Sequence, residues 1–209
     1  MTVPRLHVVT DDDVLADAGF RDRAAALIEA HGPALALHLR SPGGPVRRLL
    51  EEAEALVGPA DGAGALLVVN DRPDVALAVG GHGVQLGRRS IPVQATRALL
   101  GDDAVIGCST HGVAEAVSAA ENGADFVFIG TIWDTPSHPD VEGAGLARVR
   151  ETVAGTDAPV LAIGGVTPAR AREAVAAGAW GVAAIRGVWH AGDPVAAAAE
   201  YLQTMMESE

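Results

Sequence analysis

The sequence predicts an α/β protein of the (β/α)8 TIM-barrel class, and three observations support this. Eight short runs rich in Val, Ile and Leu recur along the chain, nearly continuous, as in parallel strands that are buried on both faces. Ala-rich amphipathic stretches separate most of these runs. The 209 residues show no second zone of composition, so we expect one barrel domain over residues 1–209. A doubly wound open sheet is the alternative, but eight units is the number that closes a barrel.

The apolar runs give the expected strands in chain order. They cover residues 5–10, 34–40, 65–70, 83–87, 105–110, 125–130, 159–165 and 181–187. Helices are expected at 20–32, 45–58, 112–123 and 167–179, with a small helix within 71–82. The second and third of these end in Gly, and the fourth starts with a Thr–Pro pair that is typical of a helix start. Residues 131–145 contain two prolines and are expected to form a long, functional loop.

The composition limits the partners of the protein. A net charge of −12 argues against nucleic acid and anionic membranes, which both need a basic surface. An anionic small molecule would need a local cationic or amide-rich pocket. The single cysteine, Cys108, allows no internal disulfide and favours a cytoplasmic protein, and the N-terminal stretch shows neither a signal peptide nor a membrane span. The oligomeric state stays open, and a homo-oligomer is compatible with the sequence.

The polar residues at the ends of the apolar runs are the candidates for an active site. In a barrel, the carboxyl ends of the strands and their loops meet at one face, where such sites are built. His38 and Arg40 are two residues apart, so both point to the same side of their strand. Asp71 alone would be a poor metal site, and His7 has no partners in the pattern and is expected to be structural or exposed. The candidates are His38, Arg40, Asn70, Asp71, Gln85, Ser109 and His111.

The last two runs are expected to bind a phosphate group. Gly164 and Gly165 permit close approach of a ligand to the backbone, and a helix start follows them. The loops after strands seven and eight are the usual phosphate site of this architecture. The eighth run ends in Ala184, Ile185 and Arg186, whose amides and guanidinium would complete the site.

Several motifs together resemble the thiamine phosphate synthase and thiazole tautomerase superfamily. They are "LHVVTD", "LHLR", "VNDRPDVALAVGGHGVQLG", "IGCSTHGVAEAVSAAENGADFVFIGTIWDTPSH" and "VLAIGGVTPARAREAVAAGAWGVAAI", in this order. The resemblance extends from about Arg5 to Val188. It implies a (β/α)8 barrel that binds a small phosphorylated thiazole at the last two strands.

The synthase branch joins a pyrimidine diphosphate to the thiazole phosphate with the help of magnesium. Its pattern has Gln, Arg and Lys at the end of the second strand, where this chain has His38, Arg40 and Pro42. Asp71 matches one metal ligand of the synthases, but the position of the second holds Ser90, and a loop lysine is replaced by His138. These four departures favour the tautomerase branch.

The tautomerase branch needs no metal and resembles this chain in "LHLR" and in Gln85. His111 matches the histidine to which that branch assigns the proton transfer, and an imidazole titrates near neutral pH. The resemblance implies that Arg40, Thr135 and Ser137 hold the substrate carboxylate, with His138 nearby in the same loop. Arg186 stands where the family usually has Ser; it would either add charge to the phosphate site, which we favour, or point outward between barrel and helix.

We therefore expect an isomerase, a thiazole tautomerase that aromatises a carboxythiazole phosphate without a cofactor. One alternative is a thiamine phosphate synthase that binds Mg²⁺ at Asp71. Another is a non-catalytic regulatory barrel that binds thiazole phosphate, although such a barrel needs no titrating group at His111.

Overall fold

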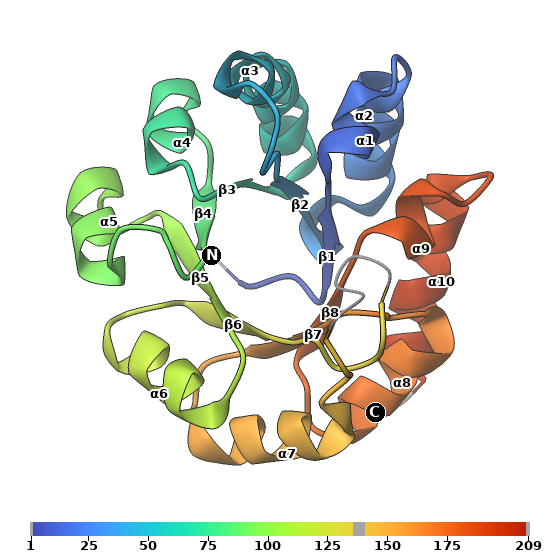
Figure 1. Cartoon of the computed structure of the whole chain (residues 1–209). Coiled ribbons are helices and arrows are strands. Elements are labelled where there is room, and N and C mark those ends of the chain that lie inside the picture. Colours follow the sequence, from blue (N-terminus) through green and yellow to red (C-terminus); the bar gives the residue numbers. More distant parts are fainter. Residues whose placement is uncertain (1, 136–140, 208–209) are drawn as a thin grey trace.

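The computed structural model describes residues 2–135 and 141–207, and it confirms the TIM barrel. Eight parallel strands close in the order β1 to β8, and the helices surround them (Figure 1). The strands are β1 (Leu6–Val9), β2 (Leu35–Leu39), β3 (Leu66–Asn70), β4 (Gly83–Leu86), β5 (Val105–Thr110), β6 (Phe126–Ile129), β7 (Val160–Ile163) and β8 (Gly181–Ala184).

The helices of the described residues lie on the outside of the barrel (Figure 1). They are α1 (Asp12–Ala16), α2 (Phe20–His31), α3 (Val46–Ala63), α4 (Pro73–Val79), α5 (Val93–Leu100), α6 (Val113–Glu121), α7 (Gly145–Gly155), α8 (Pro168–Ala176), α9 (Arg186–Trp189) and α10 (Pro194–Met206), with a 3-10 turn at Gly32–Ala34. None of these helices is long and apolar enough to cross a membrane.

Each strand starts within one residue of the expected run, but β7 and β8 end earlier than expected. After β7, Gly164 and Gly165 have φ angles of 97° and 65°, which end the extended conformation. After β8, Arg186 opens the short helix α9 instead of prolonging the strand. The predicted phosphate-binding residues therefore lie in turns at the barrel mouth.

Helix α3 differs most from its expected range. It does not end at Gly58 but continues through Pro59 to Ala63, and Gly64 caps it with a φ of 73°. Ala53, Leu56 and Ala60 are fully buried on one face, so the apolar pattern that packs the helix on the barrel continues past the proline. Burial of this face outweighs the local signals of a helix end.

The inside of the barrel holds two histidines among aromatic rings. His7 on β1 and His38 on β2 are fully buried, and the His7 ring centre lies 4.9 Å from those of His38 and Phe126. The ring centre of Phe128 lies 5.3 Å from that of His38. Burial, followed by the charge of His38, holds the pKa of His7 well below its usual value. Burial also lowers the pKa of His38 to about 3, so both rings are neutral at physiological pH.

Neutral buried histidines make the stability of the fold depend on pH. Their folded-state pKa values lie below the unfolded value, so their contribution is full above about pH 6.5 and is lost as the pH falls. Replacing His38 by Gln should therefore reduce the loss of stability between about pH 7 and pH 5 by about 2 kcal/mol. Urea unfolding of both proteins at the two pH values measures this, and equal losses would contradict it.

Candidate functional site

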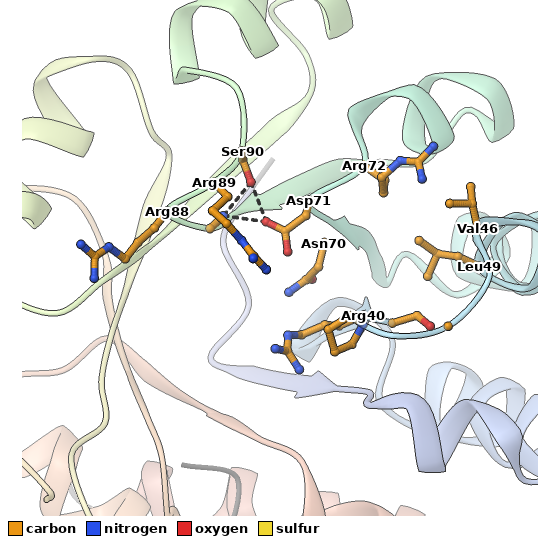
Figure 2. Close-up of a pocket in the computed structure, with 13 residues that line it drawn as sticks. Arg40, Val46, Leu49, Asn70, Asp71, Arg72, Arg88, Arg89 and Ser90 are labelled. Atoms are coloured by element: carbon orange, nitrogen blue, oxygen red, sulfur yellow. Dashed lines mark hydrogen bonds between the residues drawn. The ribbon is translucent and has the colours of Figure 1, made fainter. Parts of the chain in front are cut away.

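A cavity of about 400 Å³ opens at the carboxyl ends of β2, β3 and β4. Figure 2 shows its side chains, which come from the ends of these strands and the loops that follow them. Two apolar side chains of α3, Val46 and Leu49, form part of its wall. Its polar lining consists of Arg40, Ser41, Asn70, Asp71, Arg72, Arg88, Arg89 and Ser90.

Four arginines give this cavity a positive charge in a chain whose net charge is −12. Arg72 is paired with Asp74, its neighbour two residues along the chain. Within residues 2–135 and 141–207, neither Arg40 nor Arg89 has a carboxylate within ion-pair distance. Guanidinium groups bind phosphate oxygens through paired hydrogen bonds, so the cavity suits an anion with several such oxygens.

The loop after β2 is held in place by Asp12, at the start of α1. Its carboxylate accepts hydrogen bonds from Ser41 Oγ at 2.6 Å and from the amides of Gly43 and Gly44 at 2.9 and 3.1 Å. Burial alone would raise the pKa of Asp12, but these hydrogen bonds outweigh it and lower the pKa. This negative charge fixes the wall of the cavity beside Arg40.

Asp71 connects the end of β3 to the loop after β4. Its φ of 60° lies in the left-handed region, which is unusual for a residue other than Gly and is often found at functional sites. Its Oδ1 accepts hydrogen bonds from the Gly87 amide at 2.9 Å and from Ser90 Oγ at 2.5 Å (Figure 2). The Ser at position 90 thus orients the Asp71 carboxylate in this chain.

These residues fit a magnesium ion that takes most of its ligands from a substrate. Mg²⁺ is commonly bound by one or two carboxylates together with substrate phosphates and water. The Gly87 and Ser90 bonds both reach Oδ1 of Asp71, and none of the described residues donates a hydrogen bond to Oδ2. No group of three His, Cys, Asp or Glu that would hold a metal alone occurs among the described residues. Asp71 Oδ2 is therefore the protein ligand that the cavity offers.

Gln85 and Ser109 lie inside the barrel, away from the lining of this cavity. Gln85 on β4 is buried, and its Nε2 donates to Ser109 Oγ at 3.0 Å. Its Oε1 is buried without a hydrogen-bond partner. His38 is also buried, and its Nδ1 lies 3.2 Å from Oδ1 of Asn70, which lines the cavity.

His111 does not line this cavity. Its side chain is 52% exposed, and its Nδ1 lies 3.3 Å from Oε2 of Glu115 on α6. The His111 amide donates to the same oxygen at 2.8 Å, and its carbonyl accepts from Arg148. The imidazole is therefore half in solvent and paired with a helix carboxylate.

The turns after β7 and β8 are packed against residues 131–134. A Cβ on Gly164 would come within 2.6 Å of Thr131 Cγ2, and one on Gly165 within 2.6 Å of the Asp134 carbonyl oxygen. Both glycines are thus required by close packing. Ala184 is buried at the end of β8, and Ile185 caps α9. Arg186 begins α9, and its Nη1 is buried without a hydrogen-bond partner.

The predicted carboxylate-binding residues are only partly described. Thr135 is half-buried after β6. Ser137 and His138 lie outside the described residues.

Two groups of site residues were missed in the sequence. Arg72, Arg88 and Arg89 line the cavity, and a pair of arginines directly after a strand was a visible signal for them. His7, expected to be without partners, has its Nδ1 2.7 Å from Nε2 of His38. Both histidines interrupt runs that are otherwise apolar, and this was the signal for an interior pair.

The comparisons with known proteins agree with one another. The model of the family described as thiamine monophosphate synthase matches residues 6–188. A thiamine-phosphate synthase of Methanoculleus marisnigri is 42% identical, and the match covers 92% of this chain and 91% of the relative. A thiamine-phosphate synthase of Streptomyces avermitilis is 40% identical, and the match covers 94% of this chain and 97% of the relative. The solved structure of a thiamine phosphate pyrophosphorylase from Pyrococcus furiosus has a TM-score of 0.84 and 33% identity over 98% of this chain and 96% of its own.

These relatives correct the expected activity, its enzyme class and the expected absence of a cofactor. They carry the name of the synthase, so the prediction of a thiazole tautomerase, an isomerase, is wrong. The proton transfer assigned to His111 belonged to that activity. The prediction that no cofactor is needed rested on the tautomerase branch and is wrong too, since the resemblance assigns magnesium to the synthase branch, whose name these relatives carry. The four departures from the synthase pattern do not outweigh the similarity of this chain to the synthases over nearly its full length. The chain belongs to the thiamine monophosphate synthase family.

Proposed function

We propose that this protein is a thiamine-phosphate synthase, a transferase that joins a pyrimidine diphosphate to a thiazole phosphate and releases diphosphate. The observation that carries the proposal is the cavity at β2–β4, whose lining holds four arginines and one carboxylate. The relatives that share nearly the full length of the chain support the same activity.

The arginines of the cavity would bind the diphosphate and stabilise its departure. Joining the two rings breaks the bond between the pyrimidine part and the diphosphate, and negative charge grows on the leaving group. In the described part of the chain, neither Arg40 nor Arg89 has a carboxylate within ion-pair distance, so both can donate hydrogen bonds to this charge. Preorganised cations at a site of developing charge lower the barrier without further rearrangement.

Asp71 would hold a magnesium ion, which would supply positive charge against the leaving diphosphate. The chain's own part is to hold the Asp71 carboxylate still. The hydrogen bonds from Gly87 and Ser90 to Oδ1 do this, and no described residue donates to Oδ2, which is left to bind the ion.

The thiazole phosphate is assigned to the turns after β7 and β8. Gly164 and Gly165, with Ala184 and Ile185, would offer backbone amides at the barrel mouth. The buried Nη1 of Arg186 lacks a partner, and a buried guanidinium nitrogen in this state is costly unless a ligand supplies an acceptor. The polar groups of Gln85, Ser109 and Thr135 would then orient the two rings between the phosphate sites, and His38 would act on them through Asn70.

The remaining features fit an enzyme of a reducing cytoplasm that acts on small phosphorylated molecules. Cys108 is buried, and burial raises the pKa of its thiol to about 11, so it is an unreactive core residue.

The first test of the proposal is a coupling assay with both substrates and Mg²⁺. The wild-type protein should form thiamine phosphate and release diphosphate, and the rate should disappear when the metal is chelated. Absence of product at saturating Mg²⁺ would contradict the proposal.

The second test is the variant Asp71→Asn. An Asn tolerates the left-handed backbone and can still accept hydrogen bonds from Gly87 and Ser90, so only the charge is lost. The Mg²⁺ concentration for half-maximal rate should rise about tenfold or more, because a lost ion contact is worth at least about 1.4 kcal/mol. Asp103→Asn, at an exposed turn, is the matched control and should behave as wild type. An unchanged magnesium requirement in Asp71→Asn would remove Asp71 from the metal site.

The third test is the variant Arg40→Met. Loss of a charge-assisted hydrogen bond should raise KM for the pyrimidine diphosphate about tenfold or more. Arg40→Lys should restore only part of the affinity, since Lys cannot form the paired bonds of a guanidinium. Arg172→Met, which breaks an exposed ion pair with Glu207, is the control. If Arg40→Met and Arg172→Met gave the same KM, the diphosphate would not lie at Arg40.

A further inference from the structure

Three side chains connect the interior of the barrel to the arginine cavity. His7 Nε2 lies 3.1 Å from the Pro4 carbonyl oxygen, and His7 Nδ1 lies 2.7 Å from His38 Nε2. His38 Nδ1 lies 3.2 Å from the Asn70 side-chain amide, which lines the cavity. Each link is within hydrogen-bond distance, and all three side chains are buried.

The Pro4 carbonyl sets the direction of this chain of hydrogen bonds. A carbonyl only accepts, so His7 Nε2 must carry the hydrogen. A neutral imidazole has one N–H, which leaves His7 Nδ1 as an acceptor. His38 Nε2 must then carry the hydrogen that His7 Nδ1 accepts, and His38 Nδ1 is left as an acceptor too.

Two acceptors cannot form a hydrogen bond, so the group of Asn70 that faces His38 must be its NH2. The two ends of a side-chain amide exchange places by a half turn of its terminal bond. We propose that His7, acting through His38, holds the Asn70 amide with its NH2 on His38 Nδ1 and its carbonyl oxygen in the cavity, where it accepts a hydrogen bond from the ligand.

The opposite orientation of Asn70 would require a buried cation. For Asn70 Oδ1 to accept from His38 Nδ1, His38 must carry a hydrogen on that nitrogen, and one of the two histidines must then be doubly protonated. The rings that surround the pair are Phe126 and Phe128, which supply no negative charge. An uncompensated charge in such a place strongly destabilises the fold.

With Asn70 in this orientation, the arginines and Asn70 bind different groups of the ligand. An amide carbonyl cannot donate to a phosphate oxygen, so the arginines bind the diphosphate and Asn70 selects a ligand group with an N–H or O–H. With the proposed function, on which this step rests, that group belongs to the heteroaromatic ring of the pyrimidine diphosphate. His7 is then a positioning residue that never touches the ligand.

The first experiment reads the hydrogen positions in the free protein. Two-bond ¹H–¹⁵N spectra of ¹⁵N-histidine-labelled protein near neutral pH distinguish the two neutral forms of each ring from the charged form. His38→Gln and His7→Asn assign the two signals. Both rings should carry their hydrogen on Nε2. A hydrogen on Nδ1 of His38, or a charged ring, would overturn the proposal whatever the protein's activity.

The second experiment follows the effect on binding. His7→Leu removes the acceptor for His38 Nε2, whereas His7→Asn keeps an acceptor near the position of Nδ1 and is the matched control. Calorimetry with Mg²⁺ should show about tenfold weaker binding of the pyrimidine diphosphate to His7→Leu and near wild-type binding to His7→Asn. The affinity for inorganic diphosphate should be the same in all three proteins.

Equal affinities of the three proteins for the pyrimidine diphosphate, or a parallel loss for inorganic diphosphate in His7→Leu, would contradict the positioning role. If the wild-type protein bound inorganic diphosphate but not the pyrimidine diphosphate, the proposed function would fail, while the spectra would still decide the orientation of Asn70. Thermal unfolding of each variant separates loss of fold from loss of positioning.

Discussion

The concentration of positive charge at one side of the barrel mouth is the constraint on which the account depends. Like charges repel, and this repulsion weakens the fold unless an anion is bound there. In the described part of a chain that has an excess of acids, Arg40 and Arg89 nevertheless have no carboxylate within ion-pair distance. The carboxylates near the cavity accept hydrogen bonds from the backbone instead: Asp12 from the loop after β2, and Asp71 from the loop after β4. The cavity is thereby left with a positive charge that suits a diphosphate and its metal ion.

The barrel interior determines how the polar groups of the mouth are oriented. Closure of eight strands leaves little space inside, and this chain fills it mainly with Val, Leu and Ala side chains, two Phe and two His. Because the two imidazoles are neutral and face a backbone carbonyl at one end, their hydrogen bonds run in one direction. The Pro4 carbonyl thus sets the direction of the hydrogen bonds as far as Asn70, which lines the cavity. Three hydrogen bonds therefore connect the packed barrel interior to the ligand-binding side chain of Asn70.

The sequence predicted most of the fold because buried parallel strands leave a strong local pattern of apolar runs. It failed where tertiary burial overrode a local signal, as at Gly58 and Pro59, which helix α3 passes through. Of the candidate site, Arg40, Asn70 and Asp71 were predicted to lie together, since strand ends meet at one face, whereas Arg88 and Arg89 were overlooked. The choice of branch was wrong because each substitution was judged alone. Ser90 in place of a carboxylate looked like a lost metal ligand, yet its hydroxyl holds Asp71 in position.

A crystal structure of the protein with diphosphate and Mg²⁺ tests the central claim most directly. We expect density for the diphosphate between Arg40 and the β4 loop, and a metal ion at Asp71. Diphosphate bound only at the turns after β7 and β8, with Arg40 and Arg89 facing solvent, would contradict it.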